Sequence, residues 1–549
     1  SWDRSQDDQA DFLAGAPVRV LAAGEGGLGR TEQYAALPHV RAAAPAVRTT
    51  LPLSGDRTAT VLALDTTSAT GSFLMRRDLA SGPVPRLLAG LAPKSATAGL
   101  KLPAGTARLR LTAALHSSAP GRSGGARGSV DLAATLEDRH GVPYRMPLGA
   151  LATDGRARPL DLDLPTTAGP LTLTGLDLGV AQPIDRAEQH RLTVSQAEAT
   201  GSDGTVRRLP LPTAWTTALD GTDLNASPDG STAPTSPKVT ATRPLTVTYG
   251  TGYVPHEEPW LLGAVSVRLQ VAQPAQPEIT ALATDRFLTA AGAHPGQRVD
   301  VTFAGRNLPV RIVGSLRALP TTGSGTDRGA SLDAAHDGGG LLMDLRSVNR
   351  LLQSRYGESA PATEWWLRAD AHQAADVAAE LRALPDVDPE QVVVRDEIAG
   401  QLRDDPFGAG PAAAFTAAAV IAAALAAVGF AVSAAGALRE RDAEFAVLRA
   451  LGAPRRQLAR MLAAEQSVLV ALALLVGVAL GAVLTRAVIP LIVLTGQATK
   501  PVPEVLVELP VAQVALLLAA VAAAPLVVTA ALTLRRADPA VSLRDRGGE

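Results

Sequence analysis

The chain has 549 residues, of which 46% are hydrophobic and 19% charged, and it contains no cysteine. At ~100–200 residues per domain, this length predicts about three to five structural units, and the apolar content excludes a largely disordered chain. The formal charge of −2 argues against a nucleic-acid partner bound through bulk basic charge. The absence of cysteine excludes disulfide scaffolds, thiol nucleophiles and cysteine-ligated metal centres.

Residues 1–405 have the composition of a protein that folds in water, because charges, Pro and Gly recur every few positions. Residues 1–95 and 276–405 alternate strand-like and helix-like segments, which predicts a mixed α/β lobe encoded in two parts. The expected strands are 18–21, 60–64, 298–303, 310–315, 365–368 and 392–395, and the expected helices are 31–37, 345–354 and 372–384.

Residues 96–275 have a different pattern. They contain many short runs of strand-forming residues, with Gly, Pro, Asp and Asn between them. Short strands separated by such turns are typical of two packed sheets, so we expect an inserted β-sandwich here. Two stretches rich in turn residues, 213–238 and 320–340, are expected to be loops.

Residues 406–549 are far more apolar. Three stretches, 412–438, 467–495 and 511–534, contain almost no charge, Arg486 being the exception. Since ~20 apolar residues are enough to cross a bilayer as a helix, each stretch is long enough to be a transmembrane helix. The sequence therefore predicts an α+β membrane protein: a mixed α/β extracytoplasmic domain with an inserted β-sandwich, followed by three transmembrane α-helices.

The distribution of arginine predicts an orientation in the cell membrane. Arginine is concentrated in the connector 439–460 and in the tail 535–549, whereas the connector 496–510 contains none. An excess of positive charge marks the cytoplasmic side, so we expect the first connector and the C-terminus to be cytoplasmic and residues 1–405 to be extracytoplasmic. An external part requires an export signal or an earlier span. The first residues are polar and acidic, so we expect a membrane segment before Ser1.

The inner connector contains a short amphipathic helix. Phe445, Leu448 and Leu451 are three residues apart and share one helix face. Gly452 suits the residue that follows a helix, and Pro454 suits the first position of the next one. Such a helix can dock into a groove on a soluble partner, or it can lie on the bilayer surface with its arginines reaching the headgroups. Both interpretations remain open at this point.

A sequence motif overlaps this helix. It consists of Arg441, Glu444, the run Leu-Arg-Ala-Leu-Gly-Ala at 448–453, Glu465, and the tail residues Pro539, Leu543 and Arg544. In these residues the chain resembles the FtsX/MacB-type permeases of ABC transporters. The resemblance is strongest over residues 405–549 and weaker over 275–405 and 1–95. Residues 96–275 match no part of the usual family pattern.

The resemblance implies partners and a mechanism. In this family a separate cytoplasmic ABC ATPase docks on the short inner helix, two permease subunits associate as a homo- or heterodimer, and membrane lipids surround them. Carried over, the ATPase-coupling residues would be Arg441, Glu444, Phe445, Leu448, Arg449, Leu451 and Gly452. The permease would bind no cofactor and would not be an enzyme. In agreement, the sequence contains no G-x-x-x-x-G-K-[ST] motif for nucleotide phosphates.

The function implied is coupling of ATP hydrolysis to movement of the extracytoplasmic domain, which would export or extract a lipid, lipoprotein, peptide or glycolipid. Two alternatives remain. A division-type permease would move no substrate and would activate an extracellular cell-wall hydrolase. A membrane-anchored receptor would bind glycans through the inserted domain. A neighbouring ATPase gene would favour the first two functions over the third.

Other motifs have weaker support. Gly477 and Gly481 form a G-x-x-x-G pattern, which predicts close helix packing. The G-x-S-x-G match at 121–125 has loop-like flanks in place of a strand and a helix, so it is not expected to be catalytic. The oxygen-rich stretch 220–229 lacks the spacing of an EF-hand. The histidines are too dispersed to predict a zinc site. We therefore expect no catalytic, cofactor or metal residues.

Overall fold

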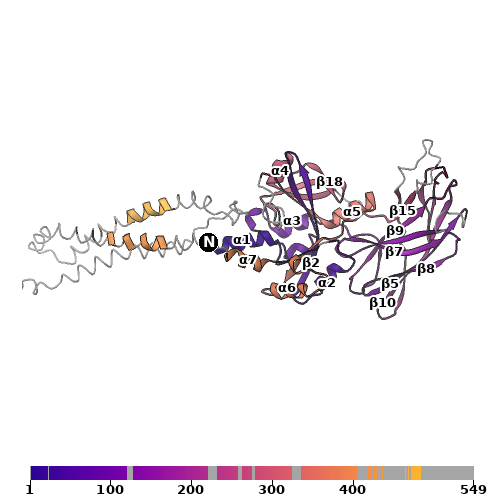
Figure 1. Cartoon of the computed structure of the whole chain (residues 1–549), viewed down its shortest axis with the longest axis horizontal. Helices are drawn as coiled ribbons and strands as arrows, with labels where there is room; N and C mark the ends of the chain where they lie inside the picture. Colours follow the sequence, from indigo (N-terminus) through magenta and orange to yellow (C-terminus); the bar gives the residue numbers. More distant parts are fainter. Residues whose placement is uncertain are drawn as a thin grey trace, which may run out of the picture. The chain divides into compact units, whose positions relative to one another are not determined.

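A computed structural model describes residues 2–22, 24–119, 128–220, 232–257, 263–274, 278–323 and 335–404 (Figure 1). In the C-terminal part it describes the helical residues 417–422, 424–426, 428–429, 432, 436, 464, 468, 471–481 and 483. The chain divides into two compact units. One is Ala10–Ile398, and the other combines Ser1–Gln9 with Ala399–Glu549.

The first unit contains a nine-stranded sheet. Its strands are β1 (Val18–Leu21), β2 (Val40–Leu53), β3 (Arg57–Leu64), β16 (Ile279–Thr284), β17 (Arg298–Phe303), β18 (Arg306–Leu316), β19 (Asp337–Asp344), β20 (Glu364–Ala369) and β21 (Val392–Val394). Their order is β17-β18-β16-β19-β3-β2-β20-β1-β21. The pairs β16–β18 and β19–β3 are parallel, and the other neighbours are antiparallel. Because β19 pairs with β3, strands from both ends of this unit's sequence form a single sheet.

Five helices pack on this sheet: α2 (Arg30–Ala35), α3 (Val84–Leu91), α4 (Asp285–Ala291), α5 (Leu345–Tyr356) and α6 (Ala374–Arg382). The chain also contains α1 (Trp2–Ala14) and α7 (Arg395–Arg403), with short 3-10 turns at Ser68–Gly71, Arg77–Leu79 and Pro389–Gln391. Helix α5 positions the site described below. It begins at Asp344, whose side chain accepts a hydrogen bond from the backbone of Ser347, and it ends at Gly357 in the left-handed conformation. These are standard signals for the start and end of a helix.

Two predicted loops contain strands. β19 begins inside 320–340, and two strands of the inserted part overlap 213–238. In β19 the sequence was misleading because glycine is a poor strand former, yet three glycines occupy 338–340. At Gly339, which has φ of 79°, an added Cβ would lie 2.5 Å from the backbone nitrogen of Phe287. Glycine is required there because α4 approaches the strand so closely.

The inserted part consists of two antiparallel sheets. Its strands are β4 (Leu100–Lys101), β5 (Thr106–Ser117), β6 (Ser129–Glu137), β7 (Pro143–Ala152), β8 (Arg158–Asp163), β9 (Thr172–Ala181), β10 (Gln189–Gly201), β11 (Val206–Leu209), β12 (Trp215–Asp220), β13 (Thr235–Thr242), β14 (Leu245–Gly250) and β15 (Ala264–Val271). One sheet has the order β13-β14-β10-β5-β8 with β11 beside β10. The other has the order β12-β15-β9-β6-β7 with β4 beside β9.

These two sheets share one apolar core. In β15, for example, Val265, Val267 and Leu269 belong to this core, whereas Arg268 and Gln270 alternate with them and so face outward. The same alternation in β5 and β10 supplies leucines from the opposite sheet. The nine-stranded sheet has its own buried clusters on both faces. Each part of the unit therefore buries an apolar interior of its own.

The predicted fold class is wrong. Of the residues that the structure describes, 42% lie in strands and 25% in helices, so β-sheet predominates there. Within the residues that the structure describes, no helix combines the length and the apolarity needed to cross a membrane. The prediction depended mainly on the length of the uncharged stretches and underestimated the length of the strands. β2 has 14 residues and β10 has 13.

The segments predicted to span the membrane are described only in part. Within 412–438 and 467–495 the longest continuous described stretch is 471–481, which is shorter than the ~20 residues that a span needs. The stretch 511–534 lies outside the described residues. The predicted domain boundaries, at 95/96, 275/276 and 405/406, stay predictions.

Several local predictions are confirmed. β1 matches the predicted strand 18–21, and the helices expected at 345–354 and 372–384 are α5 and α6. The expected hairpin around 305–307 is the turn between β17 and β18. These are segments with clear periodicity and clear turn residues at their ends, where local sequence signals are strongest.

Candidate functional site

A buried and highly charged site lies where the two-sheet part meets the α/β part, and it is built around the hairpin between β6 and β7. We call residues 138–144 the latch hairpin. Asp138 accepts hydrogen bonds from the backbone nitrogens of His140 (2.9 Å) and Val142 (3.0 Å) and from the hydroxyl of Tyr144 (3.3 Å). Gly141, with φ of 79°, completes the turn. The loop thus fixes its own shape.

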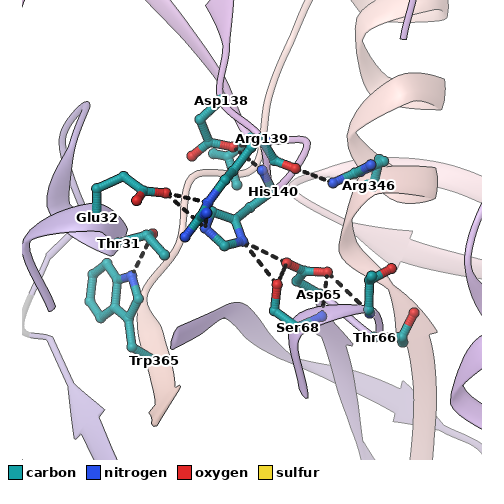
Figure 2. Close-up of polar contacts among 12 residues, drawn as sticks. Thr31, Glu32, Asp65, Thr66, Ser68, Asp138, Arg139, His140, Arg346 and Trp365 are labelled. Atoms are coloured by element: carbon teal, nitrogen blue, oxygen red, sulfur yellow. Dashed lines mark hydrogen bonds and ion pairs between the residues drawn. The ribbon is translucent and has the colours of Figure 1, made fainter. Parts of the chain in front are cut away.

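His140 projects from this hairpin between two carboxylates of the α/β part (Figure 2). Its Nδ1 lies 2.7 Å from Asp65 Oδ2, and its Nε2 lies 3.2 Å from Glu32 Oε1. The imidazole is 3% exposed. Asp65 follows β3, where its Oδ1 accepts from the backbone of Thr67 and Ser68, and its Oδ2 is shared by His140 and the hydroxyl of Ser68. Each partner is therefore held by the loop or helix that carries it.

The electrostatics favour a charged imidazole. Burial by itself lowers the pKa of His140, but hydrogen bonds to Asp65 and Glu32 and the charge of Asp138 outweigh it and raise the pKa to about 9. Burial also pushes the pKa of Asp65 and of Glu32 upward, yet the bond to His140 leaves both below their usual values. Arg139 adds an ion pair of 2.6 Å to Glu32. The raised pKa favours a protonated imidazole at neutral pH, with its two ring nitrogens facing Asp65 and Glu32.

This geometry does not support nucleophilic catalysis. Ser68 Oγ donates to Asp65 Oδ2 at 2.6 Å and lies 3.2 Å from Nδ1 of His140. In a catalytic triad the acid and the nucleophile use different imidazole nitrogens, whereas here Asp65 and Ser68 share Nδ1 and Glu32 occupies Nε2. A doubly protonated imidazole also has no lone pair with which to accept a proton. The arrangement can hold two parts of the protein together.

Apolar side chains of the latch hairpin add to this contact. Val142 and Tyr144 belong to the buried cluster that also contains Val348 and Leu352 of α5. Val142 has no exposed surface. The hairpin therefore inserts a small hydrophobic tip into the α/β core, next to the charged His140.

One face of α5 supplies a second set of contacts. Arg346, Arg350 and Gln353 are four and three residues apart, so they line one side of the helix. Arg346 donates to the backbone oxygen of Arg139, and Arg350 Nη2 donates to the oxygen of Ser95 at 2.8 Å. The opposite side of α5 packs into the sheet core. Helix α5 thus presents apolar residues to its own sheet and polar residues to the two-sheet part and the segment leading into it.

The C-terminal end of α5 is held by the outward face of β15. The backbone oxygen of Gln353 accepts from Gln270 Nε2 (2.6 Å) and Arg268 Nη1 (3.3 Å). A cation is favourable at a helix C-terminus, where carbonyl groups are unpaired. Gly357 has φ of 65°, and an added Cβ would lie 2.2 Å from Cδ of Arg268. The missing side chain lets the helix end come close to Arg268.

The site residues predicted from the sequence are elsewhere. Arg441, Glu444, Phe445, Leu448, Arg449, Leu451 and Gly452 lie outside the described residues, as does the 121–125 motif. Gly477 and Gly481 lie in the helical stretch 471–481 and are exposed. No described atom lies within 4 Å of a Cβ added at either glycine. Their role in helix packing and the coupling role of 441–452 stay predictions.

Sequence reasoning missed the latch hairpin. The Asp-x-x-Gly pattern at 138–141 does indicate a turn between two strands, but nothing near it in sequence identifies its partners. Asp65 and Glu32 are 75 and 108 residues away from His140. As for metals, no group of three or more His, Asp or Glu in the described part of the chain could hold an ion.

Comparison with known proteins finds a family similarity for the C-terminal segment. Residues 416–539 match the model of the FtsX-like permease C-terminal domain. No curated protein matches the chain. Among solved structures, a subviral particle of infectious bursal disease virus VP2 covers 48% of this chain and 67% of its own, at 13% identity and a TM-score of 0.10. That similarity is too low to indicate a shared fold. Residues 416–539 are therefore similar to the C-terminal domain of FtsX-like permeases, which is consistent with the resemblance to the FtsX/MacB-type permease family.

Proposed function

We propose that this chain is a permease subunit whose ATPase partner binds residues 441–452 in the cytoplasm. ATP hydrolysis by that partner moves the extracytoplasmic residues 1–405, and this movement exports or extracts a lipid, lipoprotein, peptide or glycolipid. A second permease subunit, identical or related, completes the assembly within membrane lipids. The observation that carries the proposal is the family match over 416–539, because this segment contains the amphipathic stretch 441–452.

The described structure suggests why the proposed extracytoplasmic part, residues 1–405, is large. A permease that transmits motion needs parts that move as bodies and a contact that joins them. The α/β part and the two-sheet part each have their own apolar core. The latch hairpin and α5 join them through directional polar contacts. This arrangement is compatible with transmission of movement from one part to the other.

The ATPase contact is tested by Leu448→Asp. Burying one leucine stabilises a complex by about 1.5–3 kcal/mol, and the aspartate would also bury an unpaired charge. We expect docking of the cognate ATPase to weaken by more than about tenfold, with loss of permease-stimulated ATP hydrolysis. The matched control is Ala450→Asp, which places the same charge about 200° around the helix. Equal docking by wild type and Leu448→Asp would exclude the docking interpretation and leave only the one in which this helix lies on the bilayer surface.

The orientation is tested by cysteine labelling, which is clean because the native chain has no cysteine. A cysteine at Ala450 should react with a membrane-impermeant maleimide only after the cells are opened. A cysteine at the exposed Ser202 should react in intact cells. Reaction of the Ala450 cysteine from outside would overturn the proposed topology.

A further inference from the structure

A charged cavity of about 410 Å³ lies beside the end of α5. Its floor is the outward face of the sheet, where Arg268 of β15 is paired in register with Asp177 of β9. Asp177 lies between Gly175 and Gly179 along this strand. Its wall is the end of α5 and the loop that follows, including Arg355. The volume falls within the range of small-molecule sites, roughly 300–1,000 Å³.

Two of the four arginines that line the cavity are fixed by carboxylates. Arg268 forms a two-point ion pair with Asp220, with Nη2 at 3.2 Å from Oδ1. Arg306 pairs with Glu358 at 2.5 Å and lies over the ring of Tyr356. These pairs hold the walls in place and leave little binding capacity on either guanidinium.

The other two arginines, Arg145 and Arg355, retain their binding capacity. Arg145 is 61% exposed, and its ion pair with Asp177 is long, with Nε 3.9 Å from Oδ2, so that no hydrogen bond occupies its N–H groups there. Arg355 is exposed, and no residue in the described ranges forms an ion pair with it. Neither arginine takes part in the contacts between Gln353 and β15. Docking of α5 therefore does not explain their presence.

The charge balance in the cavity favours an anion. Four guanidinium groups face three carboxylates, those of Asp177, Asp220 and Glu358. Burial also raises the pKa of Asp177, which disfavours its charged form. A guanidinium presents a planar fork of donors that fits two oxygens of one anion. A carboxylate offers one such pair of oxygens, whereas a phosphate can accept two forks at once.

We propose that this cavity binds a phosphate group, carried by a small molecule or by a lipid headgroup, and that Arg145 and Arg355 hold it. The side chains of Arg268 and Arg306, already fixed by their carboxylates, shape the opening. The cavity is larger than a phosphate alone requires, so the group attached to the phosphate also enters it. This site is independent of the ATPase contact at 441–452.

The test uses the full chain in a neutral detergent and isothermal titration calorimetry. The probes are inorganic phosphate, dihexanoylphosphatidylglycerol and dihexanoylphosphatidylcholine. The variants are Arg145→Gln and Arg355→Gln. The matched control is Arg191→Gln, which removes an exposed arginine from β10 in the opposite sheet. Since both site arginines lie outside the docking contacts, the thermal melting of all three variants should match that of wild type.

We expect wild type to bind at least one of the two anionic probes, inorganic phosphate or dihexanoylphosphatidylglycerol, and each site variant to bind it about tenfold more weakly or worse. Arg191→Gln should bind like wild type, and Arg355→Lys should recover part of the affinity through its charge. Tighter binding of dihexanoylphosphatidylglycerol than of inorganic phosphate would identify a lipid headgroup, and equal binding a small phosphate ester. No binding of any anionic probe, or equal losses in Arg145→Gln and Arg191→Gln, would overturn the proposal. Neither result would affect the ATPase experiment.

Discussion

The interior of the two-sheet part and its contact with the α/β part are stabilised by different interactions. The interior consists of leucine and valine from facing sheets, such as Leu111 of β5 and Leu176 of β9. The contact depends on His140 between two carboxylates and on single backbone oxygens such as that of Gln353. Apolar burial is non-directional and independent of pH, whereas an ion pair needs every partner in place and in the right charge state.

This difference has an energetic consequence. A buried ion pair contributes little net stability, but removal of one partner is costly because the other charge stays buried. The latch hairpin adds only a small apolar tip, chiefly Val142 and Tyr144. The contact between the two parts is therefore the place where this unit should open first, with both cores intact. That claim leads to four predictions, given from the largest expected effect to the smallest.

The largest effect is expected for His140→Ala, which leaves Asp65 and Glu32 buried without their cation. By analogy with other broken buried pairs, the contact should lose about 3–5 kcal/mol. Denaturant unfolding of the full chain should show the loss in a transition that precedes unfolding of the cores. The matched control is His256→Ala, which removes an exposed histidine from its pair with Asp185 and should change little. Equal effects of the two substitutions would mean that His140 stabilises the protein no more than an exposed histidine does.

Leu111→Ala should weaken the interior of the two-sheet part and leave the contact intact. Leu111 has no exposed surface, and a Leu→Ala change in a core costs roughly 2–5 kcal/mol. Hydrogen exchange should accelerate in β5 and β10 and stay slow in α5. Ile184→Ala, at a position that is 48% exposed, is the control and should cost less than about 0.5 kcal/mol. Faster exchange in α5 together with β5 would mean that the two parts unfold as one.

The contact should also depend on pH. His140 has a folded pKa of about 9 against 6.5 in the unfolded chain. Its contribution is complete below pH 6.5 and is lost as the pH rises towards 9, a change of roughly 3 kcal/mol. Asp65 and Glu32 have lowered folded pKa values, so their contribution is present above about pH 4 and is lost in more acidic solution.

The groups facing the imidazole come from each element around it: Glu32, Asp65, Asp138 and Arg139, with Arg346 acting on Asp65. Melts of wild type and His140→Gln between pH 5 and 10 test this dependence. Wild type should lose stability above pH 6.5, and the variant should lose much less. The same slope in both proteins would assign the titration to another group.

The smallest effect is expected for Gly357→Ala. Its left-handed conformation costs a side chain about 1–2 kcal/mol, and the new Cβ would also displace Arg268. Gly292→Ala separates the two causes. Gly292 has φ of 62° and no described atom within 4 Å of an added Cβ, so it has the strain without the collision. Gly357→Ala should therefore destabilise the protein more, and a smaller loss than in Gly292→Ala would contradict the close approach of α5 to Arg268.

Sequence patterns predicted the elements whose signals are local. The apolar spacing in α5 and the turn between β17 and β18 were sufficient to place them. β19 was missed because its glycines weaken a strand in isolation, and it forms only because β3 and β16 pair on either side of it. The fold class was missed because uncharged length was given more weight than the number of strands.

The site at the contact could not be predicted for a related reason. Asp138 and Gly141 indicate a turn, but the pairing of His140 with Asp65 and Glu32 depends on how two parts of the chain dock. Nothing in a single sequence records that docking. The arginines of the charged cavity pose the same problem, because Arg145 and Arg355 are about 210 positions apart in the sequence.

The most direct test of the central claim is hydrogen exchange of the full chain at pH 6.5 and pH 9.5, after correction for the intrinsic rate at each pH. At the higher pH, amides of 138–144, of α2 and of Arg346, Arg350 and Gln353 on α5 should lose protection, because His140 has lost its proton. The core strands β5, β9 and β10 should stay protected. If the latch hairpin and these strands lose protection together, or if neither changes, then His140 does not control a separable contact.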